Sequence, residues 1–411
     1  MKKEFIDLGK QPIANRFLNE DELENEFFYN LKMGLDEETL LVSQMETVEA
    51  SDMFNENYVY HSSGTETMRN HFNSTAERLN LLFSPDRVLE IGSNDGVFIK
   101  HFNKDTTVAV EPCSNFAKIT NEMGYQTYDE FWNYDTSDKI LKEHGKQDLI
   151  YAANCMCHIH DIEQAFLSVE NVLSDNGVFV FEDPSLMAAY LRNSYDQFYD
   201  EHVHLFTITA LNNILKKTNL EICGVDQINH IHGGTNRVFV KLKNNKKVSK
   251  DENNINTVLA DEELLDLNKM IAYEFWAENI QNSKMFLYDL LASLKKRDLK
   301  LVSYGATSKS TTIFNYCNIG TDIIDYIVDT TPAKQGKLSP GMHIPVVSYE
   351  EGWTEDVRGA FLGAWNYSDF ITEKEKAFLG RGGFFITHVP EVDIVTKPTC
   401  IPCGANKEVE E

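Results

Sequence analysis

The segment YDQFYDEHVHLF, residues 195–206, concentrates side chains that can move protons. Tyr199, Glu201 and His202 lie close together, and His204 follows them. A histidine beside a carboxylate can act as a general base near neutral pH, and a tyrosine hydroxyl can donate a hydrogen bond to developing negative charge. Histidine-rich loops are more often structural, so this segment alone leaves a catalytic and a packing role open.

The segment VLEIGSNDGVFIKHF, residues 88–102, has the pattern of a strand that ends in a glycine turn before a helix. Gly92 and Gly96 would let the backbone pass close to a ligand. Glu90 and Glu111, at the ends of two successive predicted strands, would repel phosphate but suit the ribose hydroxyls of an adenosine. The turn is not the dinucleotide pattern G-x-G-x-x-G. A glycine turn in an unrelated α/β fold is the alternative.

Composition and charge exclude several classes of function. The chain has 411 residues and a formal net charge of -26, from 38 basic and 64 acidic residues, so a nucleic-acid partner is not expected. It has no apolar run of the ~20 residues that span a bilayer, and its start lacks the apolar region of a signal peptide, so we predict a cytoplasmic protein with no membrane partner. Seven cysteines at irregular spacing indicate reduced thiols. Cys400 and Cys403 supply only two of the four ligands that a structural zinc site needs, and their role stays open.

Alternating apolar strands and amphipathic helices predict the elements that position these residues. The pattern predicts helices at 71–83 and 162–175 and strands at 87–92, 107–112, 147–154 and 177–184. This alternation predicts an α/β fold with a doubly wound, parallel sheet. Ligands bind such sheets at the carboxyl ends of the strands, where the glycine turn and the 195–206 segment would both lie.

Composition also suggests domain boundaries. A polar stretch at 243–258 precedes a long predicted helix at 261–298 and a second series of alternating strands and helices. We therefore predict a small irregular N-terminal module at 1–70, an α/β domain at 71–245, a second α/β domain at 246–398 and a polar tail at 399–411.

Several segments, taken together and in order, resemble one family. YDQFYDEH, LEIGSNDG, HGGTNRVFV and YGATSKSTTIFNY are similar to segments of the sugar C-methyltransferases, which are class I S-adenosylmethionine-dependent methyltransferases with a C-terminal Rossmann-like domain. The resemblance covers nearly the whole chain. It implies transfer of a methyl group from S-adenosyl-L-methionine, leaving S-adenosyl-L-homocysteine, to the carbon next to the ketone of a nucleoside-diphosphate keto-deoxysugar, in deoxysugar or polysaccharide biosynthesis.

The resemblance also assigns site residues. It implies that His202 is the general base, that Glu201 and Tyr199 support it, and that His158 or Tyr199 stabilises the enolate oxygen. His160 and His204 have no assigned role and are expected on the surface or in packing. The cofactor-binding residues that it implies are Glu90, Gly92, Asn94, Asp95, Gly96, Glu111, Pro112 and Asn154. The substrate-binding residues that it implies are Tyr58, Tyr60, Gly234, Arg237, Ser308, Lys309 and Ser310.

Ser308, Lys309 and Ser310 open a predicted helix. The backbone N–H groups of this helix and Lys309 could receive a phosphate. The alternative is a dinucleotide-like domain used only for packing. The sequence also departs from the family: its members carry four N-terminal cysteines that bind a structural zinc, whereas residues 1–70 contain no cysteine. We therefore expect no zinc and no other metal site.

Three other functions stay open. The same cofactor half would serve methylation at oxygen or nitrogen of a sugar or polysaccharide precursor, or a non-catalytic module that only binds the cofactor. An oxidoreductase is disfavoured because VSYGATSKS lacks the dinucleotide glycine turn. We expect a monomer or homodimer. The sequence names neither the sugar, nor the nucleotide base, nor the carbon that is methylated.

Overall fold

The computed structural model describes residues 1–398. The chain divides into two compact units, of which the first comprises residues 1–9, 29–190 and 197–277. The second comprises residues 10–28, 191–196 and the described chain from 278 onward. The four-part division drawn from the sequence stays a prediction, and Cys400 and Cys403 lie outside the described residues.

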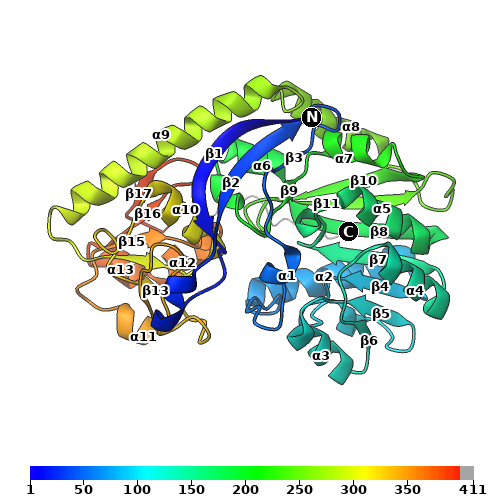
Figure 1. Ribbon diagram of the computed structural model, residues 1–411, viewed down its shortest axis with the longest axis horizontal. Coiled ribbons are helices and arrows are strands. Elements are labelled where there is room, and N and C mark those ends of the chain that lie inside the picture. The colour runs from blue at the N-terminus through cyan, green and yellow to red at the C-terminus, as the bar shows by residue number, and fades with distance from the viewer. Residues whose placement is uncertain (399–411) are drawn as a thin grey trace, which may run out of the picture. The chain divides into compact units, whose positions relative to one another are not determined.

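A seven-stranded sheet forms the centre of the first unit, in the order β10-β11-β8-β7-β4-β5-β6 (Figure 1, cyan to green). Within this order, the neighbouring strands β8, β7, β4, β5 and β6 are parallel. β11 is antiparallel to both β8 and β10. Their bounds are β4 (Val88–Ile91), β5 (Thr107–Val110), β6 (Gln126–Tyr128), β7 (Gln147–Ala153), β8 (Leu173–Pro184), β10 (Leu220–Ile228) and β11 (Thr235–Leu242). The chain therefore has the doubly wound α/β fold that the sequence predicts, with an antiparallel pair at one edge.

Helices cover both faces of this sheet because alternate residues of its buried strands are apolar on both sides. Strand residues such as Leu89, Ile150 and Phe181 pack on one face with the apolar sides of α4, α5, α7 and α8, whereas Val88, Tyr151 and Val180 pack on the other with α2. The helices of this unit are α2 (Glu66–Phe83), α3 (Ser114–Glu122), α4 (Tyr134–His144), α5 (Ile162–Val172), α7 (Ile208–Leu215) and α8 (Glu252–Leu264), with the short α1 (Ala50–Met53) and α6 (Leu186–Leu191).

Two predicted helices end differently in the structure. The helix expected at 162–175 stops at Val172, and the next residues begin β8, because Leu173 pairs with Gln147 and the sequence SDNG is a poor helix former. The single helix expected at 261–298 is instead α8 followed by α9 (Met270–Lys295). The backbone between them includes Asp266 in the left-handed region, with φ of 55°, which ends a helix.

The N-terminal residues form a second sheet of four strands, in the order β1-β2-β3-β9. Its first three strands are β1 (Lys2–Pro12), β2 (Phe28–Asp36) and β3 (Val42–Gln44), and the fourth is β9 (His204–Leu205) from far along the chain. β3 is antiparallel to both β2 and β9, with Val42 opposite Leu205 and Ser43 opposite His204. The N-terminal module therefore pairs directly with the segment that follows His202.

The second unit contains a six-stranded sheet in the order β14-β13-β12-β15-β16-β17, parallel except for β17. Trp353, Phe378 and Phe385 contribute to its aromatic core. Its strands are β12 (Leu301–Tyr304), β13 (Ile327–Val328), β14 (Val346–Val347), β15 (Gly359–Leu362), β16 (Phe384–Thr387) and β17 (Asp393–Val395). Its short helices are α10 (Ser308–Cys317), α11 (Tyr349–Gly352), α12 (Ser368–Lys374) and α13 (Lys376–Gly380).

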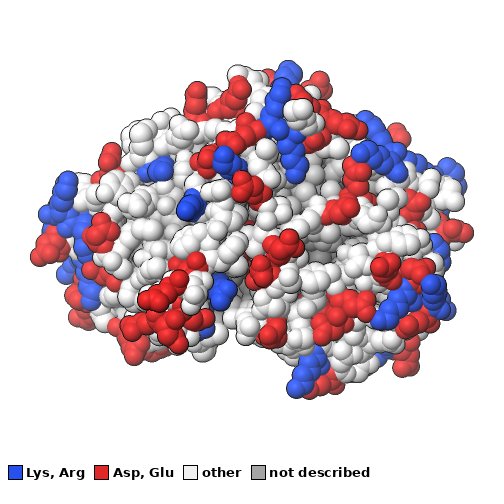
Figure 2. Space-filling model, in the orientation of Figure 1, with Lys and Arg blue, Asp and Glu red and all other residues white. Residues whose placement is uncertain are grey.

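The surface carries the acidic excess of the sequence. Figure 2 shows groups of acidic side chains on one face, with basic side chains scattered among them. Among the helices that the structure describes, none combines the length and apolar character needed to span a membrane.

Candidate functional site

His202 is held in one orientation by both of its ring nitrogens. Nδ1 lies 2.8 Å from the carbonyl oxygen of Gln197, and Nε2 lies 2.8 Å from the hydroxyl of Tyr199. Because a carbonyl oxygen only accepts, Nδ1 carries the proton of the neutral ring, and the lone pair of Nε2 accepts from Tyr199. The side chains are almost fully buried, with His202 4% and Tyr199 8% exposed. A neutral imidazole with its lone pair fixed in this way is the form that a general base needs.

His158 lies beside His202, with the two rings stacked at 5.5 Å between centroids. It ends a 3-10 turn, Met156–His158, that follows β7, and Phe54 stacks on it at 5.3 Å. Burial lowers the pKa of His158 to about 3, so the ring is neutral at physiological pH. Its Nε2 is buried and has no hydrogen-bond partner among the described residues. This atom is available to a ligand, because a buried polar atom otherwise requires a partner.

Glu201 is tied to the N-terminal part of the chain. Its Oε2 accepts a hydrogen bond of 2.9 Å from the hydroxyl of Tyr58. Burial, followed by the charge of Glu201, raises the pKa of Tyr58 well above its usual value, so the hydroxyl stays protonated and remains a donor. The predicted substrate residue Tyr58 and the predicted catalytic residue Glu201 are thus brought together.

The glycine turn after β4 has the backbone conformation that its sequence predicts. Gly92 and Gly96 have φ of 74° and 76°, in the region that favours glycine. A Cβ on Gly92 would lie 3.0 Å from the Sγ of Cys155, so this turn also has no room for a side chain. The space and the backbone angles together require glycine here.

Two buried carboxylates lie at the strand ends beside this turn. Burial and the neighbouring charges of Glu111 and Asp95 raise the pKa of Glu90 well above its usual value, and Glu90 Oε2 has no hydrogen-bond partner among the described residues. Glu111 accepts backbone hydrogen bonds from Asn94 at 2.7 Å and Cys113 at 2.9 Å. Burial raises the pKa of Glu111 as well. The carboxyl oxygens at these strand ends can accept hydrogen bonds from hydroxyl donors such as those of a ribose.

The segment 58–63 lies against the glycine turn. Asn94 donates to the carbonyl oxygen of Tyr60 at 3.0 Å and accepts from the backbone N–H of Ser62 at 2.9 Å. Asp95 accepts from the hydroxyl of Ser63 at 2.6 Å. The expected cofactor residues Asn94 and Asp95 therefore hold this segment, which in turn carries Tyr58 to Glu201.

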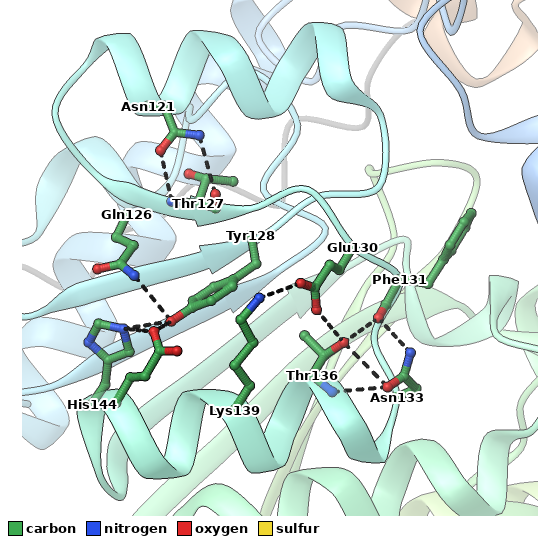
Figure 3. Close-up of polar contacts among 11 residues, drawn as sticks. Asn121, Gln126, Thr127, Tyr128, Glu130, Phe131, Asn133, Thr136, Lys139 and His144 are labelled. Atoms are coloured by element: carbon green, nitrogen blue, oxygen red, sulfur yellow. Dashed lines mark hydrogen bonds and ion pairs between the residues drawn. The ribbon is translucent and has the colours of Figure 1, made fainter.

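Polar contacts join β6, the edge strand of this sheet, and the loop after it to helix α4 (Figure 3). The hydroxyl of Tyr128 in β6 accepts from Gln126 at 3.1 Å and lies 2.8 Å from Nε2 of His144. Glu130 contacts Lys139 at 2.6 Å and accepts from Thr136 at 3.0 Å. These contacts hold the loop after β6 at the carboxyl end of the strand next to Glu111, a position that no sequence motif marks.

Arg237 lies in a buried network of charges. Its Nε donates to Glu182 at 2.8 Å and its Nη2 donates to Thr75 at 2.5 Å, and the side chain of Arg237 is 6% exposed. Burial acts to raise the pKa of Glu182, but the hydrogen bonds and charges of His71 and Arg237 outweigh it and lower the pKa to about 2. This environment supports the fold, and the expected substrate role of Arg237 stays a prediction.

The turn at Gly234 is linked to His202 by hydrogen bonds through Gln197. Gly234 has φ of 119°, and its carbonyl oxygen accepts from the N–H of Ser185 at the end of β8. In the same turn the carbonyl oxygen of His232 accepts from the side chain of Gln197 at 2.7 Å. Gln197 is the residue whose carbonyl oxygen orients His202. The Gly234 turn thus supports the loop that carries His202.

In the second unit, Lys309 is buried and does not extend into solvent. Its Nζ lies 5.3 Å from the ring centre of Trp365, and the side chain is 9% exposed. Burial lowers the pKa of Lys309, and the charge of Asp196 partly offsets this effect. Asp196 is itself fully buried and accepts from Trp365 at 2.5 Å. The neighbouring Ser310 contributes to a capping box with Thr307.

One group of possible metal ligands lies within the described chain, formed by Cys157, His158 and His202. Both nitrogens of His202 already have hydrogen-bond partners. Burial and the charge of Asp183 raise the pKa of Cys157 well above its usual value, which disfavours the thiolate that binds a metal. A metal at this group would have to displace the hydrogen bond between Tyr199 and His202 and the proton of Cys157.

His204, expected from the sequence on the surface or in packing, is a packing residue in the structure. It is 3% exposed, and its Nε2 lies 3.1 Å from the carbonyl oxygen of Ile159. Two buried polar residues near the site were not predicted: Gln44, whose amide contacts the 199–202 turn, and Asp183, whose pKa burial raises to about 7. Both are polar residues at the ends of apolar strands. Sequence alone cannot tell such a buried polar residue from an exposed one.

Three family models match the chain in succession. Residues 1–54 match a zinc binding domain, residues 66–224 a methyltransferase domain and residues 230–390 the C-methyltransferase C-terminal domain. The C-methyltransferase NovU of Streptomyces niveus is 27% identical over 397 residues, which cover 95% of this chain and 94% of NovU. The chain is therefore similar to C-methyltransferases over nearly its whole length. It is an S-adenosylmethionine-dependent methyltransferase.

Solved structures of single methyltransferase domains are similar to part of this C-methyltransferase. An S-adenosylmethionine-dependent methyltransferase from Clostridium acetobutylicum is 18% identical and covers 42% of this chain and 90% of its own, with a TM-score of 0.32. A methyltransferase from Anabaena variabilis is 14% identical and covers 48% of this chain and all of its own, also with a TM-score of 0.32.

The cofactor and zinc differ in how well the residues fit them. The glycine turn, with no room for a side chain at Gly92, and the unpartnered oxygen of Glu90 fit S-adenosylmethionine. Zinc is bound by cysteine and histidine, with carboxylates as additional ligands, whereas residues 1–54 contain neither cysteine nor histidine. The matched segment therefore lacks the cysteine and histidine donors of a structural zinc site.

Proposed function

We propose that this C-methyltransferase methylates the carbon next to the ketone of a nucleoside-diphosphate keto-deoxysugar, with His202 as the general base. The observation that carries the proposal is the fixed orientation of the His202 ring, whose Nδ1 lies 2.8 Å from the carbonyl oxygen of Gln197 and whose Nε2 lies 2.8 Å from the hydroxyl of Tyr199. A carbon bonded to hydrogen becomes nucleophilic only after deprotonation, and the adjacent ketone makes this possible by placing the charge on oxygen. A base and a donor to that oxygen are therefore the minimum requirement.

His158 and Tyr199 are the proposed donors to the enolate oxygen. His158 is neutral, and its Nε2 is buried without a partner in the described chain. The hydroxyl hydrogen of Tyr199 would turn from His202 Nε2 to the ketone oxygen, which frees the Nε2 lone pair to take the proton from carbon, and the protonated Nε2 would then donate to the Tyr199 oxygen. Glu201 supports the loop through its hydrogen bond with Tyr58. One donor of this kind contributes about 3 kcal/mol of transition-state stabilisation.

The proposed cofactor site lies at the carboxyl ends of β4, β5 and β7. Glu90 and Glu111 would receive the ribose hydroxyls, and Gly92 and Gly96 would allow close approach. Asn94, Asp95, Pro112 and Asn154 complete the set that lines these strand ends. When bound, S-adenosylmethionine supplies an electrophilic methyl group, and S-adenosylhomocysteine remains.

The proposed substrate residues fall into two groups. Tyr58, Tyr60 and Gly234 lie in the segments that support the proposed base. Arg237 would act indirectly, through its hydrogen bond to Glu182. In the second unit the turn before α10, with the backbone N–H groups of Ser308 and Ser310, is the candidate phosphate site, and Lys309 would support it from its buried position near Asp196. We further propose that the enzyme works in the cytoplasm as a monomer or homodimer and has no nucleic-acid or membrane partner.

Hydrogen exchange tests the carbon-base proposal directly. The enzyme is incubated in D2O with a nucleoside-diphosphate keto-deoxysugar and no methyl donor, and deuterium at the carbon next to the ketone is followed by NMR. The wild-type enzyme should exchange this hydrogen, and His202→Asn should lose at least about 100-fold of the rate, the contribution of one general base. His160→Gln, which changes an exposed histidine near the same site, should exchange like the wild type.

Absence of exchange in the wild type, together with methylation of a hydroxyl or amine, would show an O- or N-methyltransferase. Tight binding of S-adenosylmethionine with no turnover on a panel of sugar nucleotides would show a module that only binds the cofactor.

A further inference from the structure

Residues 1–54 match a zinc binding domain but contain no cysteine or histidine, and the polar contacts of this segment point to a different task. β3 ends in Gln44, and the next strand of the sheet is β9, which follows the base. The backbone N–H of Gln44 donates to the carbonyl oxygen of Val203 at 2.9 Å. The pairing therefore continues from β9 to the residue directly after His202.

The side chain of Gln44 makes an unusual set of contacts. Its Nε2 lies 2.8 Å from the carbonyl oxygen of Tyr199, 3.1 Å from that of Asp200 and 3.0 Å from that of His202. The residue is fully buried. Three converging carbonyl oxygens can be satisfied only by a donor, so the NH2 group of the amide faces them.

These three carbonyl oxygens belong to the turn that carries the base. The N–H of His202 donates to the carbonyl oxygen of Tyr199 at 3.0 Å and closes the turn. The side chains of the same turn bring His202 Nε2 and the hydroxyl of Tyr199 within 2.8 Å of each other. Gln44 thus holds the backbone of the turn whose side chains form this pair.

We propose that Gln44 is a positioning residue for the general base, and that the N-terminal module orients the catalytic turn through this amide without a metal. The inference rests on the proposed role of His202. Small displacements of a catalytic group reduce the rate strongly, because proton transfer requires near-contact geometry. Loss of the amide would release three carbonyl oxygens and let the turn shift.

The chain offers a matched control for this contact. Gln147 at the start of β7 is also fully buried, its Nε2 donates to a backbone carbonyl oxygen, that of Gly145, and its Oε1, like that of Gln44, has no partner in the described chain. Gln44→Met and Gln147→Met remove the same amide at similar volume. Gln44→Asn keeps the donor group on a shorter side chain and serves as the milder variant if Gln44→Met does not fold.

The experiment measures kcat, KM, the dissociation constant of S-adenosylmethionine, the melting temperature and the D2O exchange rate for each variant. We expect Gln44→Met to lose at least 10-fold in both kcat and exchange, with cofactor affinity unchanged within two-fold. Gln44→Asn should fall between this variant and the wild type. Gln147→Met should keep the wild-type kcat even if its melting temperature falls by as much as that of Gln44→Met.

Two outcomes separate this inference from the proposed function. Exchange by the wild type and by Gln44→Met at equal rates would overturn the positioning role and leave the carbon base intact. Absence of exchange in the wild type would overturn the carbon base itself. An equal loss of kcat in Gln44→Met and Gln147→Met would show that Gln44 acts only through stability.

Discussion

At the scale of single residues, the base is defined by its neighbours as much as by its own ring. His202 has a fixed tautomer because Gln197 offers only a carbonyl oxygen to Nδ1. Tyr199 then donates to Nε2, and Glu201 is held by Tyr58 from a distant part of the chain. The catalytic turn is therefore supported by hydrogen bonds from three directions.

Removal of the Tyr58 hydroxyl tests this support. Tyr58→Phe keeps the ring but leaves Glu201 without the hydrogen bond at 2.9 Å. Because a hydrogen bond to a charged group contributes about 1.5 kcal/mol, kcat should fall roughly 10-fold. Steady-state kinetics measures the loss. Tyr134→Phe, at an exposed tyrosine at the start of α4, is the control and should retain full kcat; equal rates for the two variants would contradict the role of Tyr58.

At the scale of elements, the first turn of α10 shows that a sequence typical of phosphate binding can also stabilise the interior of the fold. The turn between β12 and α10 resembles a phosphate-binding turn in sequence, and its helix begins with a capping box between Thr307 and Ser310. Lys309, however, packs over Trp365 near the buried Asp196. The lysine compensates a buried charge, which is costly to leave unpaired.

A substitution of Lys309 distinguishes support of the fold from phosphate binding. Lys309→Met should destabilise the protein by about 3 kcal/mol, because it leaves Asp196 as a buried charge with one partner fewer. The double variant Lys309→Met/Asp196→Asn should recover part of this loss. Thermal unfolding measures both. A higher KM for the nucleotide sugar with unchanged stability would instead show direct phosphate contact.

Lys284→Met is the control for this pair of variants. Lys284 lies 4.1 Å from the ring centre of Tyr316 but is half-buried, so its loss should change the stability by less than about 1 kcal/mol.

At the scale of the whole molecule, buried ionisable groups make stability depend on pH in opposite directions. Burial lowers the pKa of His204 to about 3, so the unfolded chain binds a proton below pH ~6.5 that the folded chain does not bind. His204 therefore costs stability as the pH falls. Burial raises the pKa of Asp183 to about 7, so the folded chain keeps a proton that the unfolded chain has lost, and Asp183 costs stability as the pH rises through 7.

Two variants separate these effects. Between pH 6.5 and 5, His204→Gln should lose about 2 kcal/mol less unfolding free energy than the wild type, at ~1.4 kcal/mol per pH unit. Asp183→Asn should remove the loss of stability that the wild type shows between pH 5 and 8. Urea unfolding at each pH measures both changes, and parallel curves for all three proteins would contradict these assignments.

The sequence by itself determined the α/β fold and the glycine turn with Glu90 and Glu111 at the strand ends, because strand alternation, glycine turns and strand ends are encoded by neighbouring residues. The proton-transfer roles near His202 stay a prediction. Only the tertiary structure decided which distant groups meet. Gln44 and the turn at Tyr199 are 155 residues apart, and Tyr58 and Glu201 are 143 apart. The burial of Lys309 and Arg237 likewise follows from packing between elements. Side-chain type suggests what a residue can do, but long-range contacts decide whether it faces a ligand or stabilises a buried charge.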